Sequence, residues 1–278
     1  MDEGFGADGR RAGRLLLAAS YNVHGCVGRD GREDPERVAR VIRELEADLV
    51  GLQEVGARSG AAGKVRQMEK LADASGFHCI AGPTILRGNG DYGNVLLTGR
   101  RAREIRRLDL SLPRREPRGA IDVDLDVEGI HLRVIVTHLG LRPGERRFQV
   151  KRLLDVLSLE AGVLTVVMGD INEWLPGSRP LRWLHRRLGR APALRTFPSF
   201  LPVLALDRIW VWPMKALTAI DVHGSPAARI ASDHLPLKVT IDVMTTPAAE
   251  RRRVAPPPEL VGTPAGHFSG YREPDRDG

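Results

Sequence analysis

Polar side chains that could perform catalysis stand at the ends of several short apolar runs in this chain. Asn22, Glu54 and Asp170 each end a run of strand-forming residues, and the motifs Thr137–Leu139 and Ser232–His234 each add a histidine. Such groups cost free energy at the edge of a core unless something pairs with them. One site that gathers them around a divalent cation and a phosphate is the most economical explanation.

Asn22 and Glu54 offer oxygen ligands. If their strands are parallel neighbours, both side chains emerge at one carboxyl edge, where ligands usually bind in α/β sheets. A carboxylate and a carboxamide, together with waters and a substrate phosphate, suit Mg²⁺, with Mn²⁺ as a substitute. The pair contains no thiolate or imidazole, which disfavours zinc. Taken singly, each residue is more often a cap or a surface group.

Gly169–Asn172 carries two further groups at a strand end. Asp170 and Asn172 are two residues apart and can therefore point the same way. The aspartate can accept a proton from water or hold the water in line, and the asparagine can donate to a phosphoryl oxygen. An Asx turn after a buried strand explains the same pair equally well.

His234 supplies a group that exchanges protons near neutral pH. Asp207 begins an apolar run and could pair with this imidazole, which would fix its tautomer and favour its charged form. His138, at the end of the run 134–137, is placed to donate to a phosphate oxygen. For a single histidine at a strand end, however, a structural role is the more common outcome.

The groups must be positioned by a series of strands and helices, which the pattern of apolar residues along the chain predicts. Apolar runs at 15–21 and 48–55 predict buried strands, and Asp34-Pro35-Glu36 predicts the start of a helix between them. Asp122, Asp124 and Asp126 alternate with apolar residues, which predicts a half-exposed strand with a solvated acidic face; metal binding is the other interpretation. Further strands are expected at 94–98, 102–110, 119–127, 131–137, 164–168, 209–212, 215–221 and 235–243, and helices at 64–74, 143–160 and 180–188. This order indicates two packed sheets flanked by helices.

Together the motifs, spread over residues 15–243, resemble those of the endonuclease/exonuclease/phosphatase superfamily of metal-dependent phosphoesterases. The motifs that carry the resemblance are Ser20–Gly25, Leu52–Val55, Tyr92–Leu97, Pro117–Ala120, Thr137–Leu139, Gly169–Asn172, Leu206–Ile209 and Ser232–Pro236. The resemblance implies a four-layer αββα sandwich of the deoxyribonuclease-I-like type, with two central, mostly antiparallel or mixed β-sheets.

The resemblance also implies a role for each residue. Glu54 would be the main metal ligand, with Asn22 close by and Asp233 near the metal. Asp170 would orient or activate the attacking water, and His234 paired with Asp207 would be the acid/base group. Asn172 and His138 would hold the phosphate, and Asn94 and Arg118 match recurrent polar, substrate-binding positions of the family.

The substrate is less well specified. An abasic-site repair enzyme is disfavoured because Glu54 is followed by Val55-Gly56 and because 211–232 contains no aromatic run. Thr196–Ser199 resembles a branch of small bacterial hydrolases and would place Phe197 near the pocket, although a core aromatic fits as well. The leading hypothesis is a Mg²⁺-dependent phosphodiesterase or phosphatase acting on a small or lipid-derived phosphoester. A nuclease and a non-catalytic binding protein are the alternatives.

Composition agrees with a soluble, cytoplasmic protein that is expected to be a monomer. The 278 residues are 42% apolar with a net charge of +7, which favours anionic partners, nucleic acid among them. Two cysteines make no disulfide framework, and no apolar run is long enough to span a membrane. We expect a flexible segment at 1–13, one domain at 14–244 and a disordered Pro/Arg-rich tail at 245–278. Four arginines in or just after the helix expected at 180–188, Arg182, Arg186, Arg187 and Arg190, form either a phosphate-facing surface or a solvated face.

Overall fold

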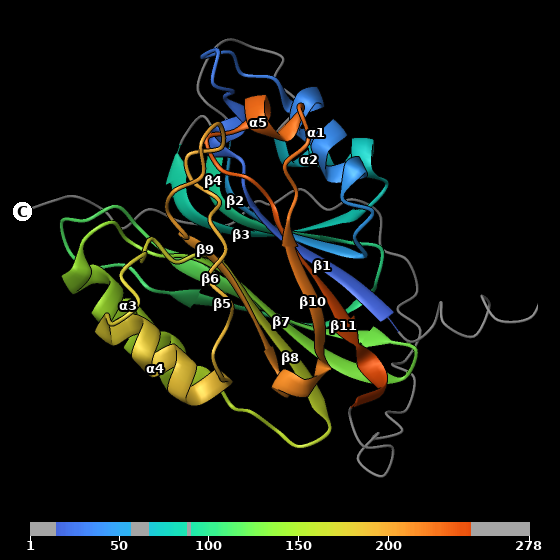
Figure 1. Ribbon diagram of the computed structural model, residues 1–278, viewed down its shortest axis with the longest axis vertical. Helices are drawn as coiled ribbons and strands as arrows, with labels where there is room; N and C mark the ends of the chain where they lie inside the picture. Colours follow the sequence, from blue (N-terminus) through green and yellow to red (C-terminus); the bar gives the residue numbers. More distant parts are fainter. Residues whose placement is uncertain (1–14, 57–66, 88–89, 246–278) are drawn as a thin grey trace, which may run out of the picture.

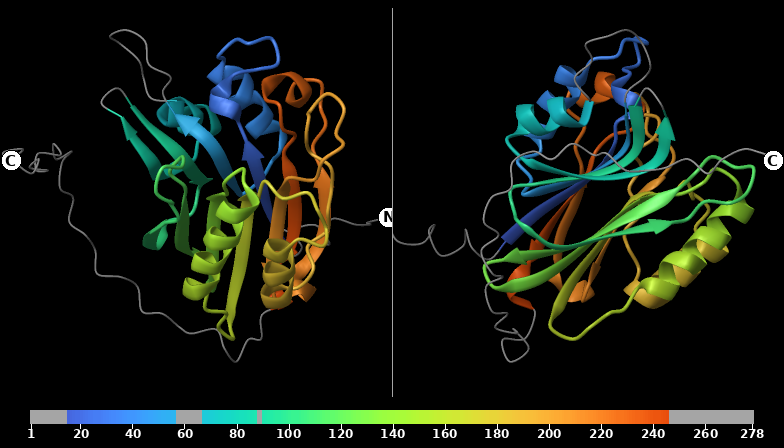
Figure 2. Two further views of the ribbon diagram at one scale, coloured as in Figure 1. Left: turned by 90° about the vertical axis from the view of Figure 1, so that its left-hand side faces the viewer. Right: turned by 180° about the vertical axis from the view of Figure 1, so that it is seen from behind.

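Two β-sheets pack face to face, and helices cover the outer face of each (Figure 1). The computed structural model describes residues 15–56, 67–87 and 90–245. Its layers run helices, sheet, sheet, helices, as Figure 2 shows from two further sides. This arrangement confirms the four-layer αββα sandwich expected from the sequence.

The first sheet has six strands in the order β10-β11-β1-β2-β4-β3. Strands β1 and β2 are parallel, with Asn22 opposite Gln53, and every other pair in this sheet is antiparallel. The strands span β1 Leu15–Asn22, β2 Leu49–Gly56, β3 His78–Arg87, β4 Gly90–Thr98, β10 Leu217–Val222 and β11 Leu237–Asp242. Its outer face is covered by α1 Pro35–Glu44, α2 Gln67–Ser75 and α5 Ala228–Ala231.

The second sheet has five strands in the order β5-β6-β7-β8-β9, of which only β7 and β8 run parallel. The strands span β5 Ala102–Asp109, β6 Gly119–Val127, β7 Ile130–His138, β8 Val163–Asp170 and β9 Asp207–Trp212. Helices α3 Pro143–Val156 and α4 Arg179–Leu188 lie on its outer face. Three short 3₁₀ turns complete the described elements, η1 His24–Cys26, η2 Met214–Ala216 and η3 Val243–Thr245.

The central strands are apolar on both faces because each face is buried in a different layer. In β7, Leu132, Val134 and Val136 point into the core between the sheets, whereas Ile135 points toward α3 and α4. This double burial explains why the runs 134–137 and 164–168 read as continuously apolar rather than alternating. It also fixes the register, since a slip of one residue would exchange the two faces.

Most predicted elements are confirmed, with two local differences. The Asp34 carboxylate caps α1 by accepting a hydrogen bond from the Arg37 backbone N–H at 3.0 Å. Helix α3 ends at Val156 rather than at residue 160, because the backbone of Leu157 is already extended. Strand β3 was not predicted, since Gly82-Pro83 interrupts its apolar pattern.

The expectation of a solvated acidic face on β6 is wrong. Asp122 is only 1% exposed, and Asp124 is also buried. Strand β6 lies between β5 and β7, which supply Arg106 and Arg133, and both guanidinium groups donate to the Asp122 carboxylate. Asp122 and Asp124 therefore belong to a buried ion-pair network, which a pattern read along one strand cannot reveal, whereas Asp126 is half-buried.

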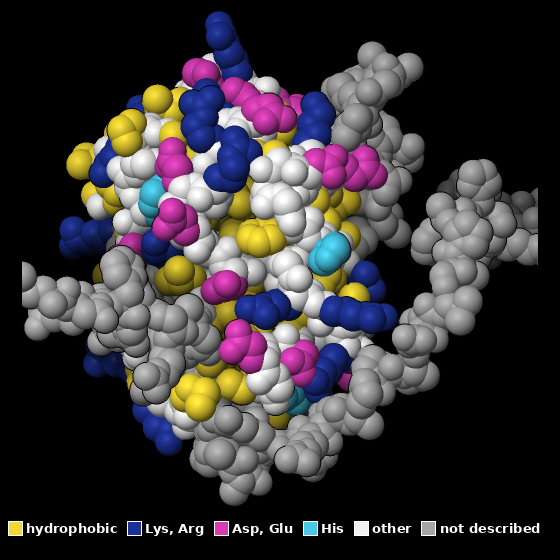
Figure 3. Space-filling model, turned by 90° about the vertical axis from the view of Figure 1, so that its right-hand side faces the viewer, with side chains coloured by type: hydrophobic (Ala, Val, Ile, Leu, Met, Phe, Trp, Pro, Cys, Tyr) yellow, Lys and Arg dark blue, Asp and Glu magenta, His cyan; other side chains and the backbone are white. Residues whose placement is uncertain are grey.

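The net positive charge does not collect in one patch on the face shown in Figure 3, where Lys and Arg side chains intermix with Asp and Glu. Within the described residues, no helix is long and apolar enough to cross a membrane. The predicted flexible segment 1–13 lies outside the described residues, and so does the predicted tail beyond Thr245.

Candidate active site

The polar strand ends converge at one end of the sandwich. The parallel pair β1–β2 brings Asn22 and Glu54 there from the first sheet, and the parallel pair β7–β8 brings His138 and Asp170 from the second. Asp207 lies opposite Asp170 in the β8–β9 register. Because both sheets end their parallel strands at this edge, residues far apart in sequence meet there.

Gly169 allows the close approach of β7 and β8 at the site. Its φ is +149°, a conformation that L side chains rarely adopt. A Cβ at this position would overlap the carbonyl oxygen of Thr137 on the neighbouring strand. Only glycine therefore fits immediately before Asp170, where the register sets His138 opposite the carboxylate.

Asp170 lies at the centre of the site and is almost completely buried. Its Oδ2 accepts a hydrogen bond from Asn22 Nδ2 at 3.1 Å and lies 3.5 Å from His138 Nε2 and 3.6 Å from His234 Nε2. Its Oδ1 accepts from the Asn172 backbone N–H at 2.9 Å. One carboxylate thus contacts four other groups predicted from the sequence.

His138 is held as a neutral donor by Arg118. The guanidinium NH1 lies 3.0 Å from His138 Nδ1, and because arginine can only donate, Nδ1 accepts and Nε2 carries the proton. Burial lowers the pKa of His138 to about 4, with Asp170 opposing that shift and Arg118 reinforcing it. The Nε2–H therefore faces the acceptor Asp170 Oδ2 at 3.5 Å; the Asn172 amide nitrogen, 3.0 Å from Nε2, can itself only donate and does so to the Leu139 carbonyl.

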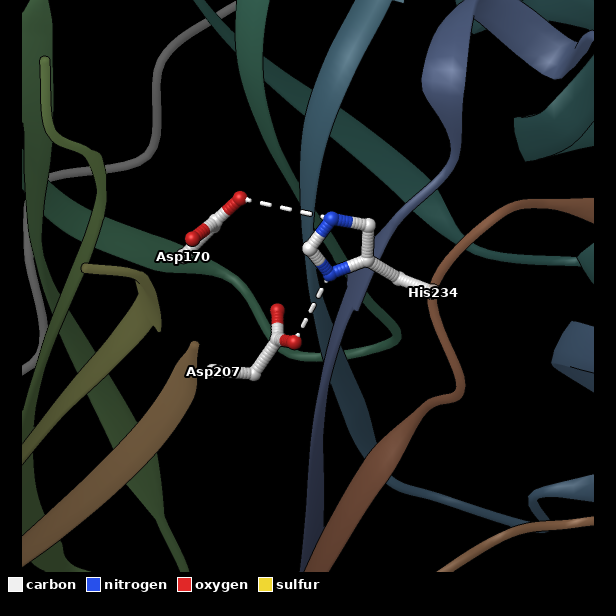
Figure 4. Close-up of side chains that lie close together, drawn as sticks. All are labelled: Asp170, Asp207 and His234. Carbon is white, nitrogen blue, oxygen red and sulfur yellow. Dashed lines mark hydrogen bonds and ion pairs between the residues drawn. The ribbon is translucent and has the colours of Figure 1, made fainter. Parts of the chain in front are cut away.

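His234 forms a buried pair with Asp207, drawn in Figure 4. His234 Nδ1 lies 2.8 Å from Asp207 Oδ2, which also accepts a 2.5 Å hydrogen bond from Thr196 Oγ1. Burial opposes charge on the imidazole, but the carboxylates of Asp207 and Asp170 outweigh it and raise the pKa of His234 to about 10. The Phe197 ring packs on this imidazole with centroids 4.9 Å apart, so this aromatic residue lies at the site.

The ligand atoms of Asp170, Asp207 and His234 all lie within 4.8 Å of one another, close enough to hold a metal ion. The His234–Asp207 hydrogen bond, however, already uses the Nδ1 atom, and Asp207 is completely buried. This trio is therefore better suited to moving a proton between Nε2 of His234 and Asp170 than to binding a cation.

A second set of carboxylates, partly exposed, fits a hard cation. Glu54 Oε2 and Asp233 Oδ2 each lie 3.7 Å from His24 Nδ1, so both carboxylates converge on one point from different segments of the chain. Asn22 Nδ2 donates to Glu54 Oε1 at 2.9 Å, while its oxygen accepts from the His24 backbone N–H. Oxygen donors at the site mouth suit Mg²⁺, and the imidazole also admits Mn²⁺.

Three residues of the site adopt positive φ, at His24 (49°), Glu54 (59°) and Asn172 (52°). Glu54 lies within a register shift of the β2–β4 pairing, between Leu52 and Val55. Such bulges re-aim a side chain, and strained backbone of this kind collects at functional sites. Local strain thus directs the Glu54 carboxylate out of the sheet and toward His24.

The structure brings together all eight residues predicted as catalytic or metal-binding: Asn22, Glu54, His138, Asp170, Asn172, Asp207, Asp233 and His234. The two predicted substrate-binding residues lie behind them. Arg118 contacts His138, and Asn94 donates to the Gly119 carbonyl at 2.9 Å, with its Oδ1 atom buried and unpartnered. Cys26 is no nucleophile, because burial raises the pKa of its thiol to about 12.

Two residues at the site escaped the sequence analysis. His24 belongs to the motif of Asn22, and its spacing of two residues was the available signal. Gln67 gave none: its amide donates to the Gly25 carbonyl and to Glu33, and accepts from the Gly56 backbone N–H. It thereby ties the turn that carries His24 to the end of the strand that carries Glu54.

Comparison with known proteins places this fold and site in one class. Residues 19–234 match the Endonuclease/Exonuclease/phosphatase family. The chain is 32% identical over 219 residues to "Uncharacterized protein YbhP" of Escherichia coli K12, a match that covers 72% of this chain and 85% of YbhP. This chain belongs to the endonuclease/exonuclease/phosphatase family, whose members are typically phosphoester hydrolases that use a divalent metal.

Solved structures share the fold at lower identity. A family member from Bacteroides vulgatus aligns with a TM-score of 0.66 and 18% identity over 82% of this chain and 98% of its own. A protein from Beutenbergia cavernae gives 0.65 and 22% identity over 82% and 72% of the two chains. Truncated TDP2 from Caenorhabditis elegans gives 0.61 and 15% identity over 82% and 97%. These likenesses establish the sandwich architecture.

Proposed function

We propose that this protein is a Mg²⁺-dependent hydrolase of a small or lipid-derived phosphoester, a phosphodiesterase or phosphatase. The observation that carries the proposal is the convergence on Asp170 of two imidazoles held in opposite ways. Arg118 keeps His138 neutral with its proton on Nε2, whereas Asp207 favours the charged form of His234. A neutral donor and a proton-exchanging group on either side of one carboxylate suit in-line attack by water on a phosphoryl group.

Glu54 and Asp233 would hold the metal, with Asn22 and His24 beside them. When bound, Mg²⁺ would polarise a phosphoryl oxygen and offset the negative charge that grows there. Asn22 also orients the carboxylates of Glu54 and Asp170 through the two hydrogens of its amide nitrogen. The same amide therefore supports both the metal site and the water site.

The protons would move among the chain's own residues. Asp170 would hold the attacking water and accept its proton as the new phosphorus–oxygen bond forms. His234, held at Nδ1 by Asp207, faces the site with its Nε2, 3.6 Å from Asp170 Oδ2, and would give the Nε2 proton to the departing oxygen as the old bond breaks. Nε2–H of His138 and the Asn172 amide would donate to the phosphoryl oxygens, where one such donor is worth about 10²–10³ in rate.

A hollow of about 900 Å³ beside the site supports a substrate with an apolar part. It meets the catalytic centre at Asn172 and is lined by Leu141, Trp174 and Leu175, each more than half exposed. Exposed apolar groups around a concave surface typically mark a ligand site. Arg147, Arg179 and Arg182 also line it and would favour an anionic substrate.

A nuclease is the second candidate, and the same hollow is the observation in its favour. An exposed tryptophan next to arginines can stack a base and contact a backbone phosphate. The two functions differ in their salt dependence. Binding of nucleic acid should weaken by about one log–log unit per phosphate contact, whereas a small substrate should show little dependence.

The test is a panel of phosphoesters assayed with added Mg²⁺ or Mn²⁺: nitrophenyl phosphodiesters and monoesters, phospholipids, and nicked and single-stranded nucleic acid. We expect hydrolysis of at least one member, abolished by EDTA, by His234→Ala and by Glu54→Gln. His223→Ala and Glu46→Gln are the matched controls, since both residues lie outside the site, and they should keep wild-type rates. Activity that survives His234→Ala and Glu54→Gln would reject the proposed mechanism.

A further inference from the structure

A second hollow lies on the opposite face of β9 from the catalytic centre. Side chains alternate along this strand, so Asp207 faces the site whereas Arg208 and Trp210 face the layer of α3 and α4. The hollow has a volume of about 810 Å³ and opens between α4, the segment 190–193 and β9. Four of its lining residues are arginines: Arg182, Arg186, Arg190 and Arg208. Arg182 also lines the hollow beside the catalytic site, so the two hollows adjoin at this side chain.

The arginines of this hollow are not neutralised by direct ion pairs within the described part of the chain. Among the residues that the structure describes, no Asp or Glu forms an ion pair with any of its four arginines. Arg182, Arg186 and Arg190 are exposed at the rim, whereas Arg208 is only 2% exposed. Arg208 NH1 donates to the carbonyls of Ala205 and Asp207. Burial lowers the pKa of Arg208, and the charges of Asp207 and Glu173 oppose that shift without forming a direct ion pair. An unpaired buried cation is costly, which makes this position unusual for a purely structural arginine.

Two buried nitrogens of the hollow also lack partners. Arg208 Nε and His185 Nε2 make no hydrogen bond. His185 is held between the hollow and the core, where its ring lies 5.9 Å from that of Trp210. Burial lowers the pKa of His185, and the nearby charges of Arg208 and Arg190 lower it further. Arginine keeps its own charge under these conditions, because its ordinary pKa is far above neutral.

We propose that this hollow is an anion site, separate from the catalytic centre, that binds a compact multiply charged phosphate. The planar donors of Arg208 would contact it at the floor, and Arg182, Arg186 and Arg190 would close around it at the rim. Arginine forks match phosphate oxygens, and such charge-assisted hydrogen bonds are about twice as strong as neutral ones. Because Arg208 NH1 donates to the Asp207 carbonyl, the bound anion would share one side chain with the segment that carries the His234 partner.

The experiment follows the His185 ring in the full chain by NMR, during titration with sodium pyrophosphate at constant ionic strength and with EDTA present. His185→Gln identifies the signal among the eight histidines. A saturable shift of this signal is expected, because the ring lines the hollow on the face of β9 opposite to Asp207 and the catalytic centre. Pyrophosphate bound only at the catalytic centre would move the signals of His138 and His234 and leave His185 unmoved, which would overturn the proposal.

Two variants make the test specific. Arg186→Gln with Arg190→Gln removes two exposed rim charges and should weaken binding by about tenfold or more. Arg187→Gln is the matched control on the same helix, because Arg187 instead donates to the Leu157 carbonyl and does not line the hollow. It should bind like wild type. Equal weakening by Arg187→Gln would indicate a general charge effect and would also overturn the proposal.

Discussion

Gly169 offers the sharpest link between the packing of the fold and its chemistry. In Gly169→Ala, the added Cβ would overlap the Thr137 carbonyl oxygen and lie 2.8 Å from the carbonyl carbon. Real Cβ contacts are essentially never under 3.0 Å, so the strands must separate. Moving β8 away from β7 carries Asp170 away from His138, which now lie 3.5 Å apart. A displacement of about 1 Å at a catalytic group typically costs about 10² in rate.

The loss of stability can be estimated from two separate costs. The left-handed backbone costs about 1–2 kcal/mol for alanine, and overpacking adds about 1–3 kcal/mol. Their sum, about 2–5 kcal/mol, corresponds to a fall in Tm of about 4–20 °C for a domain of this size. Thermal unfolding gives the stability, and hydrolysis of the best phosphodiester of the panel, measured well below Tm, gives the rate.

Gly129→Ala is the matched control. Gly129 also has positive φ, at 82°, but a Cβ there would meet nothing within 4 Å. It lies between β6 and β7, in the same sheet and away from the site. This variant should lose only the stability that the positive φ costs an alanine, and it should keep its activity. If Gly169→Ala retains more than half of the wild-type rate, the close approach of β7 and β8 does not position Asp170, and the reasoning fails.

Three further predictions concern the surrounding groups. Asp207→Asn keeps the side-chain shape but removes the charge beside the catalytic imidazole, and we expect kcat to fall by about 10²–10⁴ with an unchanged circular dichroism spectrum; a change under threefold would contradict this role. Although burial opposes charge on Asp124, hydrogen bonds with His131 and Arg106 lower its pKa from 3.8 to about 2. Its contribution to stability is therefore complete above about pH 4 and lost as pH falls toward 2. The free energy of unfolding, measured in urea, should fall less steeply between pH 4 and pH 2 in Asp124→Asn than in wild type. Gln67→Ala should weaken Mn²⁺ binding about 10–100-fold in calorimetry while the protein stays folded. Unchanged affinity would show that Gln67 does not position the turn that carries His24.

The fold and the core of the site could be predicted from sequence because their signals are local. Each strand is a short apolar run, and each catalytic group lies at or near one end of such a run, so topology collects them at one edge. The start of α1 could also be predicted, since Asp34 and Pro35 are strong helix-start residues. These features depend on residues that are close together in the chain.

Features that depend on neighbours across the sheet could not be predicted. The burial of Asp122 is set by Arg106 and Arg133 on the flanking strands. Gln67 joins the turn at Gly25 to the end of β2 at Gly56, 31 residues further along the chain, and nothing in its own neighbourhood indicates that role. Strand β3 was missed because its pairing with β4 outweighs the poor strand propensity of Gly82.

The position of β1 has a consequence for how the chain must be synthesised. This first strand lies inside its sheet, between β2 and the last strand, β11, with Leu15 opposite Asp242. Until β11 has emerged from the ribosome, β1 presents an open edge that invites pairing between nascent chains. His234 lies just before β11, so catalysis and closure of the sheet become available together. A product terminated before β11 would therefore leave the β1 edge open and be prone to aggregation.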